Sequence, residues 1–356
     1  MERTEQNSGT MDVRSSHRFD VAALESWMEV NVPGFRGPLK VEQFRGGQSN
    51  PTYKLTGGGR AFVLRRKPPG KLLPGAHAVD REYRVLAALG GQCFPVPPVH
   101  GLCLDDSVIG TAFYVMDMVD GRIFWEADFP QVPREERSAY FDAMNATIAQ
   151  LHSIDSEAAG LGDYGKPGNY FERQIGRWSK QYLGDVEAGR VPAMDRLVEW
   201  LPANIPTSVG DESRVIHGDF RCDNMIFHPI EPRVVAVLDW ELSTLGHPLA
   251  DFSYHLMMYR MPVGATTGLA GLDLPALGIP SEAEYVAAYC RRTGRDGIPN
   301  IDFYIAFNMF RLAAIVHGIK GRVVRGTASS THAERMAAGL EPLADLAWAQ
   351  AVRAGA

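Results

Sequence analysis

The chain has 356 residues, of which 45% are hydrophobic and 22% are charged, and its formal net charge is -6. This composition is typical of a soluble globular protein, and the length predicts about two domains because single cores stop growing near roughly 250–300 residues. The negative charge argues against a nucleic-acid partner, which would need a basic surface. No segment approaches the roughly 20 consecutive apolar residues of a membrane span, so we expect no membrane partner either.

The amino terminus and the cysteines indicate where the protein works. Residues 1–19 are polar and aperiodic, and they lack the apolar core of a secretory signal, so we expect a flexible tail. The four cysteines are scattered without metal-binding spacing, at Cys93, Cys103, Cys222 and Cys290. Such cysteines are typical of reduced thiols, and we therefore expect a cytoplasmic protein.

The first third of the chain is predicted to be rich in strands. Asp20 can cap a short helix over 21–30. Apolar periodicity then predicts one helix over 80–89 and strands over 41–44, 52–55, 61–66, 99–104 and 112–118. We expect a nucleotide-binding, β-rich lobe over residues 20–118.

The rest of the chain is predicted to be mainly helical. Periodicity predicts helices over 134–152, 171–186, 194–201, 248–259, 282–292, 301–324 and 332–351. Strands return only at 214–217, 225–228 and 234–238. The predicted class is therefore α+β, with a larger helical lobe over residues 119–356 that would carry catalysis and bind the substrate.

A polar cluster lies between two apolar strands near the middle of the chain. Asp219 is followed by Asn224 five residues later, and Asp239 comes directly after the strand at 234–238. An Asp on a loop can orient or deprotonate an attacking hydroxyl, while a second Asp and an Asn offer the oxygen ligands that Mg²⁺ prefers. The alternative is an ordinary hairpin with polar turn residues.

Two features of the predicted β-rich lobe suit phosphate binding. Glycines between two strands, in the segment 45–50, let backbone N–H groups approach a phosphate, although glycine is also common in simple hairpin loops. In the strand at 61–66, Arg65 and Lys67 share one face with Val63. Either cation could reach a nucleotide with Glu82 as partner, or both could be solvated charges at a strand end.

The segment that follows Asp239 suggests structural support for the polar cluster. Pro248 fits the first turn of a helix, and Asp251 in that turn is favoured by the helix dipole. Asp251 could also reach back to brace the loop that bears Asp219. His217 is interpreted as a packing residue of that loop, because Asp219 already supplies a base.

Five segments of the chain resemble a known family. In order they read GGQSNPTYKL, VLRRKPPG, REYRVL, HGDFRCDN and DWELSTLGHPLADF. They resemble the aminoglycoside phosphotransferase and choline kinase superfamily, in the branch of the kinase-like domain fused to some acyl-CoA dehydrogenases. The resemblance spans residues 20–350 and implies a two-lobed, protein-kinase-like fold with a small antiparallel β-rich lobe.

The resemblance also implies roles for individual residues. Asp219 would be the catalytic base, and Asn224 and Asp239 would bind Mg²⁺. Arg65 would occupy the place of the usual phosphate-binding lysine, paired with Glu82; whether Arg65 or Lys67 touches ATP stays open. The remaining nucleotide contacts would come from a phosphate loop and an adenine hinge, which are Gly46, Gly47, Gln48, Ser49 and Asn50, and Asp117, Met118 and Val119.

The acceptor is predicted to be a hydroxyl of a small molecule. No activation segment ending in Ala-Pro-Glu follows Asp239, which disfavours a protein substrate, and balanced charge over 241–356 disfavours polycationic aminoglycosides. Basic residues on the predicted helix 310–325 suit an anionic acceptor such as a hydroxyacyl-CoA, or are simply solvated. Candidate substrate residues are Arg221, Glu241, Arg311 and Lys320. The expected partners include a second copy of the chain, in a homodimer. The alternative to a kinase is a catalytically silent pseudokinase with a regulatory or scaffolding role.

Overall fold

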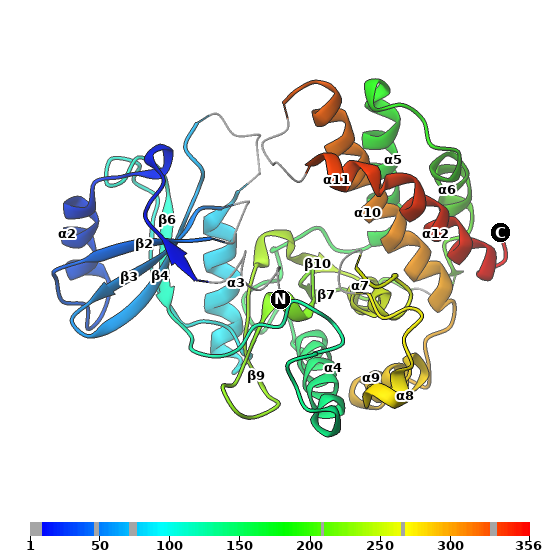
Figure 1. The fold of residues 1–356 in the computed structure, drawn as a ribbon, viewed down its shortest axis with the longest axis horizontal. Helices are drawn as coiled ribbons and strands as arrows, with labels where there is room; N and C mark the ends of the chain where they lie inside the picture. Colours follow the sequence, from blue (N-terminus) through cyan, green and yellow to red (C-terminus); the bar gives the residue numbers. More distant parts are fainter. Residues whose placement is uncertain (1–8, 46–49, 71–76, 208–209, 265–267, 328–332) are drawn as a thin grey trace. The chain divides into compact units, whose positions relative to one another are not determined.

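The structure is a computed structural model that describes residues 9–45, 50–70, 77–207, 210–264, 268–327 and 333–356. The chain divides into two compact units that interleave along the sequence (Figure 1). Unit 1 comprises Met1–Trp125, Glu157–Leu161 and Cys222–Ser243, and unit 2 comprises Glu126–Ser156, Gly162–Arg221 and Thr244–Ala356. The sequence predicted two contiguous lobes that meet near residue 118. In the structure, unit 1 consists of three separate segments of the chain.

Unit 1 is built on a six-stranded antiparallel sheet with the strand order β1-β2-β3-β4-β6-β5. Alternate residues of β3 are buried, including Tyr53 and Leu55, and they pack with Phe62 and Leu64 of β4 in one apolar core. The strands are β1 (Thr10–Met11), β2 (Lys40–Phe44), β3 (Thr52–Gly57), β4 (Arg60–Arg66), β5 (Val99–Cys103) and β6 (Phe113–Asp117).

Two residues of the segment expected to be a flexible tail belong to the sheet. Thr10 and Met11 form β1, which pairs with Phe44 and Gln43 of β2. The Tyr53 hydroxyl donates to the backbone carbonyl of His17 at 3.1 Å. These contacts join residues more than 25 positions apart, so aperiodic local sequence gives no sign of them.

Two helices and a hairpin complete unit 1. Helix α2 (Val21–Asn31) begins where the Asp20 carboxylate accepts a hydrogen bond from the Ala23 N–H at 3.0 Å, which confirms the predicted cap. Helix α3 is Val79–Gly91, with η1 at Ser15–His17. The hairpin comprises β8 (Met225–Phe227) and β9 (Val234–Val237), preceded by η5 (Cys222–Asn224) and followed by η6 (Trp240–Leu242).

Unit 2 is mainly helical, and α10 (Ile301–Val324) lies at its centre against α12, α7 and α5 (Figure 1). Between Phe303 and His317, α10 has buried residues on all its faces, which is typical of a core helix. The other helices are α4 (Arg137–Ser153), α5 (Tyr170–Gly184), α6 (Pro192–Ala203), α7 (Pro248–Leu256), α8 (Leu274–Leu277), α9 (Glu282–Thr293), α11 (Ala333–Ala338) and α12 (Leu340–Arg353), with short turns η2 (Arg134–Glu136), η3 (Val186–Ala188) and η7 (Met257–Tyr259).

Unit 2 also contains a strand that the sequence did not predict. Strand β10 (Thr244–Gly246) pairs antiparallel with β7 (Arg214–Ile216). A Cβ at Gly246 would lie 2.4 Å from Ile216 Cδ1, so glycine is needed for the close approach of this short ribbon. Helix 332–351 was also predicted as one element, but it breaks at Gly339 into α11 and α12.

The predicted fold class is confirmed, because an antiparallel β-rich unit accompanies a mainly helical one. Within the residues described, no helix has the length and apolar character required to cross a bilayer.

Candidate active site

Arg65, near the end of β4, lies at the centre of a cluster of charged residues in unit 1. Its Nε lies 2.8 Å from Glu82 Oε2 on α3, and its Nη2 lies 2.6 Å from Asp239 Oδ1. Glu241 Oε2 is 3.6 Å from the same Nη2. Burial disfavours the charged guanidinium, but Glu82, Asp239 and Glu241 outweigh it and raise the pKa of Arg65. Arg65 therefore remains a cation and links Glu82 on α3 to Asp239, which follows the β8–β9 hairpin.

Glu82 is held by neutral donors as well as by Arg65. Asn50 Nδ2 donates to its Oε1 at 2.9 Å, and the Tyr114 hydroxyl donates to its Oε2 at 3.0 Å. Burial raises the pKa of Glu82 more than Arg65 lowers it, and burial beside Glu82 raises the pKa of Tyr114. Asn50 is wholly buried and also contacts His77, at 2.9 Å from its Oδ1. Of the predicted phosphate loop, Gly46, Gly47, Gln48 and Ser49 lie outside the described residues.

The two predicted metal ligands are brought to the same end of the β8–β9 hairpin. Met225 pairs with Val237, and the Leu238 N–H donates to the Asn224 carbonyl at 2.8 Å. Asp239 follows with left-handed backbone angles, φ 67° and ψ 60°. Such a conformation is uncommon for residues other than glycine and clusters at functional sites.

The donor set fits Mg²⁺. Across the described residues no group of three or more His, Cys, Asp or Glu side chains could hold a metal. The predicted ligands are one carboxylate, Asp239, and one amide, Asn224. Mg²⁺ is commonly bound by one or two carboxylates together with water and substrate phosphates. The Asp239 side chain is 34% exposed and could offer oxygen to such an ion, in competition with its ion pair to Arg65.

The predicted adenine hinge follows β6. Asp117 is the last residue of that strand; its Oδ1 accepts from Arg60 at 3.1 Å and contacts His100 Nε2 at 2.8 Å. The Met118 N–H donates to the Ala61 carbonyl at 3.3 Å, and Met118 and Val119 are partly exposed. The strand end therefore anchors the segment in which adenine was predicted to bind.

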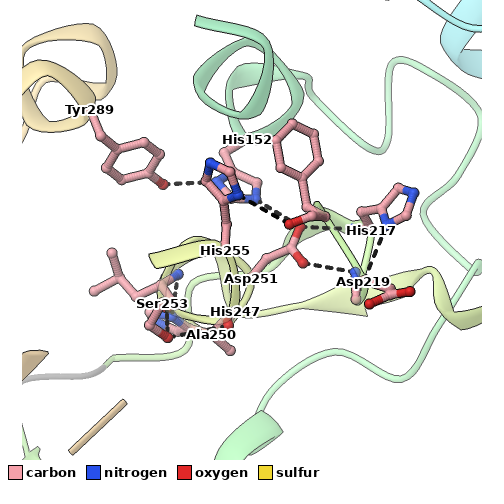
Figure 2. A network of polar contacts seen from close by, with 12 residues as sticks. His152, His217, Asp219, His247, Ala250, Asp251, Ser253, His255 and Tyr289 are labelled. Carbon is pink, nitrogen blue, oxygen red and sulfur yellow. Dashed lines mark hydrogen bonds and ion pairs between the residues drawn. The ribbon is translucent and has the colours of Figure 1, made fainter. Parts of the chain in front are cut away.

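The loop that bears Asp219 lies in unit 2 and is braced by Asp251 (Figure 2). Asp251 Oδ2 accepts from the His217 N–H at 2.8 Å, and its Oδ1 accepts from the Gly218 N–H at 2.7 Å. Gly218 has φ 83°, a turn conformation that suits glycine. The buried carboxylate thus satisfies two backbone donors and fixes the turn that presents Asp219.

Asp251 is itself held by His152 of α4, a residue that the sequence did not single out. His152 Nε2 lies 3.2 Å from Asp251 Oδ2, and its Nδ1 lies 2.8 Å from the Tyr289 hydroxyl (Figure 2). Burial would raise the pKa of Asp251, but His152 and the loop N–H groups hold it below its usual value. Asp251 therefore remains an anion in the interior.

Within unit 2, Asp219 contacts His217, Tyr254 and Arg221. Its backbone N–H donates to His217 Nδ1 at 3.1 Å, so His217 packs within the loop. Its Oδ1 accepts from the Tyr254 hydroxyl at 2.5 Å and lies 3.1 Å from Arg221 Nε. Tyr254 was not predicted from the sequence; its position three residues after Asp251 on α7 was the available signal.

Two of the four candidate substrate residues, Arg311 and Lys320, do not share one face of α10. Arg311 is 8% exposed, and its Nη2 donates to the Gly218 carbonyl at 3.0 Å. Lys320 follows nine residues later on α10 and so points about 180° away, by the roughly 100° turn per helical residue. Arg221 contacts Asp219 in unit 2, whereas Glu241 lies near Arg65 in unit 1.

His255 on α7 supports the loop and gives it a pH dependence. Its Nδ1 lies 3.1 Å from the Phe220 carbonyl, and its Nε2 lies 2.6 Å from the Tyr285 hydroxyl. A carbonyl only accepts, so Nδ1 carries the proton and Nε2 accepts from Tyr285. Burial lowers the pKa of His255 to about 4, although the Phe220 carbonyl and Asp251 oppose this.

We expect acid to destabilise the protein through His255. The unfolded imidazole titrates at 6.5 and the folded one at about 4, so between these values only the unfolded state gains a proton. Stability from this group is complete above pH 6.5 and falls by about 3 kcal/mol as pH drops toward 4. Urea unfolding at pH 7 and pH 4 should show a larger loss in the parent than in His255→Gln. Equal losses would contradict the assignment.

The comparisons with known proteins place the chain in a family. A model of the phosphotransferase enzyme family (APH) matches residues 40–304, and the chain belongs to this family. Over 345 residues the chain is 46% identical to acyl-CoA dehydrogenase family member 11 of Gallus gallus, covering 95% of this chain and 44% of that protein. The chain thus spans less than half the length of the curated relative.

Solved structures support the same fold. A Ralstonia eutropha protein classed among the aminoglycoside phosphotransferases is 52% identical, with a TM-score of 0.87 over 94% of this chain and 99% of that one. Choline kinase from Cryptosporidium parvum is 12% identical with a TM-score of 0.61, covering 92% of this chain and 100% of its own, and so shares the fold alone. The chain therefore has a small-molecule phosphotransferase fold.

Proposed function

We propose that the chain transfers the γ-phosphoryl group of Mg-ATP to a hydroxyl of a small molecule. The observation that carries the proposal is the braced loop of Asp219, within the range matched by the phosphotransferase family. Phosphoryl transfer needs little covalent chemistry from the protein and depends on positioned groups and fixed charges. A buried anion whose contacts fix one turn is an arrangement of that kind.

Each residue has a role in this proposal. Asp219 accepts the proton of the acceptor hydroxyl, and Asp251 holds the turn that presents it. Asn224 and Asp239 hold Mg²⁺, which when bound neutralises charge on the phosphates. Arg65 binds a phosphate while Glu82 orients its guanidinium, as their 2.8 Å ion pair supports.

We propose a hydroxylated acyl-CoA, or a similar anionic metabolite, as the acceptor. The relatives that match almost all of this chain carry the name acyl-CoA dehydrogenase family member, and the remainder of their length lies outside the match. We infer that a phosphotransferase that resembles one part of such a protein acts on a related compound, an acyl-CoA thioester. The rest of the support is the chain's lack of an acidic excess over residues 241–356.

The test is ATP consumption with Mg²⁺ across a panel of hydroxylated compounds. The panel contains 3- and 4-hydroxyacyl-CoAs, choline, homoserine and aminoglycosides, with Asp219→Ala as the control protein. Turnover on hydroxyacyl-CoAs that is absent in the control supports the proposal. Efficient turnover on kanamycin-type acceptors alone would overturn the acceptor class while retaining the kinase.

One observation favours a catalytically silent nucleotide-binding protein instead. Asp239 Oδ1 is engaged by Arg65 at 2.6 Å, and a carboxylate that keeps this partner offers less to a metal. A pseudokinase would bind nucleotide without Mg²⁺ dependence. Nucleotide binding that is unchanged by Mg²⁺, with no turnover on any panel member, would favour this alternative.

A lysine in place of Arg65 should be unable to keep the ion pairs with both Glu82 and Asp239. A lysine ammonium is a compact charge and cannot span Glu82 and Asp239 as the planar guanidinium does, so we expect the free energy of unfolding to fall by about 1–3 kcal/mol. Urea unfolding measures this, and ATP titration of the same proteins decides which cation contacts phosphate. Lys67→Arg is the matched control and should stay within about 0.5 kcal/mol of the parent. A larger ATP effect at Lys67 would reassign the phosphate contact.

A further inference from the structure

Tyr254 touches the predicted base directly. Its hydroxyl donates to Asp219 Oδ1 at 2.5 Å, across 35 residues of sequence. We propose that Tyr254 is a positioning residue that holds the Asp219 carboxylate in the orientation needed to receive the acceptor's proton. The proposal rests on the function given above.

One helix holds both the backbone and the side chain of the catalytic loop. Asp251 in the first turn of α7 accepts from the His217 and Gly218 N–H groups, and Tyr254 follows one turn later. Residues three apart on a helix lie on the same face. The face of α7 that fixes the turn therefore also reaches the carboxylate.

The Tyr254 ring is fixed in turn by Arg311. The Arg311 guanidinium carbon lies 5.4 Å from the centre of the Tyr254 ring, and its Nη2 donates to the Gly218 carbonyl at 3.0 Å. Arg311 is 8% exposed, so this stack is largely shielded from water. The ring that carries the hydroxyl is therefore packed against Arg311, which is itself bonded to the loop backbone.

The chemistry assigns the proton of the acceptor to Asp219 and not to Tyr254. Burial, together with the charge of Asp219, raises the pKa of Tyr254, so its hydroxyl keeps its proton and acts only as a donor. In the transfer step the acceptor O–H bond breaks and its proton passes to the Asp219 carboxylate. The acceptor oxygen bonds to the γ-phosphorus of ATP while the bond from that phosphorus to the β,γ-bridging oxygen breaks, and ADP leaves with that oxygen and its electron pair. Tyr254 donates one hydrogen bond throughout and is unchanged at the end.

Several groups of unit 2 act on Asp219. Arg221 Nε lies 3.1 Å from the same oxygen, and His217 Nδ1 accepts from the Asp219 N–H. Arg311 on α10 and Asp251 on α7 act through the loop backbone. Among these, Tyr254 is the neutral donor to the carboxylate, so its removal leaves every formal charge in place.

The experiment compares Tyr254→Phe with Tyr259→Phe in the full chain, with ATP and the best acceptor from the panel. Tyr259 is buried nearby in η7, and its hydroxyl has no hydrogen-bond partner among the described residues, so its loss is the matched control. We expect Tyr254→Phe to lower kcat by about 10- to 100-fold, the size of one hydrogen bond to a charged group. The KM for ATP and the thermal shift on nucleotide binding should stay unchanged.

A purely structural role would not move the pH profile. Loss of a donor to a carboxylate favours its protonated form, so the acid limb of kcat/KM should move to higher pH in Tyr254→Phe. Should the phenylalanine protein not fold, a ring-fluorinated tyrosine at position 254 keeps the shape and strengthens the donor, and the acid limb should then move to lower pH.

The outcomes separate this proposal from the function on which it rests. If Asp219→Asn retains full turnover, the phosphotransferase activity stands, but Asp219 is not the base and the role of Tyr254 fails with it. If Asp219→Asn is inactive while Tyr254→Phe matches Tyr259→Phe in kcat and pH profile, only the role of Tyr254 is overturned.

Discussion

Asp219→Ala is expected to lower turnover by about 10²–10⁴-fold, the usual contribution of a general base. The alanine removes the carboxylate that accepts the proton, whereas the loop backbone keeps its contacts to Asp251. Nucleotide binding should therefore be unchanged. Steady-state kinetics and an ATP titration of the same protein measure the two quantities separately.

The paired variant is Asp239→Ala, which should weaken nucleotide binding, unlike Asp219→Ala. It removes the carboxylate assigned to Mg²⁺ and the partner that Arg65 contacts at 2.6 Å. Mg-ATP affinity should fall in this protein, and ATP affinity measured without Mg²⁺ should fall much less. If both variants bound Mg-ATP equally well, the division of roles between the two aspartates would be wrong.

Local sequence patterns predicted most helices and strands, because periodicity and capping are properties of neighbouring residues. The helix at 301–324 was predicted with the bounds of α10, and Asp20 caps α2 as expected. Strand β10 was missed because its sequence, Thr-Leu-Gly, lacks the consecutive apolar residues found in β7 and β8. Its presence depends on pairing with β7, about 30 residues earlier in the chain.

The same distinction between local patterns and distant contacts applies to the residues of the candidate site. Residues in compact motifs, such as Asp219 and Asp239, could be predicted because their spacing in the sequence is itself the signal. Tyr254 and His152 were missed because each meets its partner across 35 or 99 residues. No local pattern distinguishes a tyrosine that contacts a carboxylate from one that only packs.

The basic residues of the predicted helix 310–325 have different surroundings in the structure. They were interpreted either as suited to an anionic acceptor or as simply solvated, whereas His317 is wholly buried and Arg325 pairs with Asp185 at 2.6 Å. Helical spacing alone puts Arg311 and Lys320 on opposite faces. Charged residues of a helix indicate a binding surface only when their spacing places them on the same face of the helix.

Asp251→Ala is expected to lower the free energy of unfolding by about 3–5 kcal/mol, the range for breaking a buried charge network by removing one partner. The variant leaves the N–H groups of His217 and Gly218 and the ring of His152 without their acceptor. Unsatisfied buried donors each cost about 1–3 kcal/mol, which supports the same range. Urea unfolding at pH 7 followed by tryptophan fluorescence measures the change.

The control is Asp345→Ala on α12, an exposed aspartate that should change stability by less than about 0.5 kcal/mol. The pH dependence gives a second check. The pKa of Asp251 is below its usual value of 3.8, so its contribution is complete above that pH and is lost as pH falls further. The alanine variant should lack this acid-dependent part. A variant as stable as the control would show that the loop does not depend on its brace, and Asp219 would then need another support.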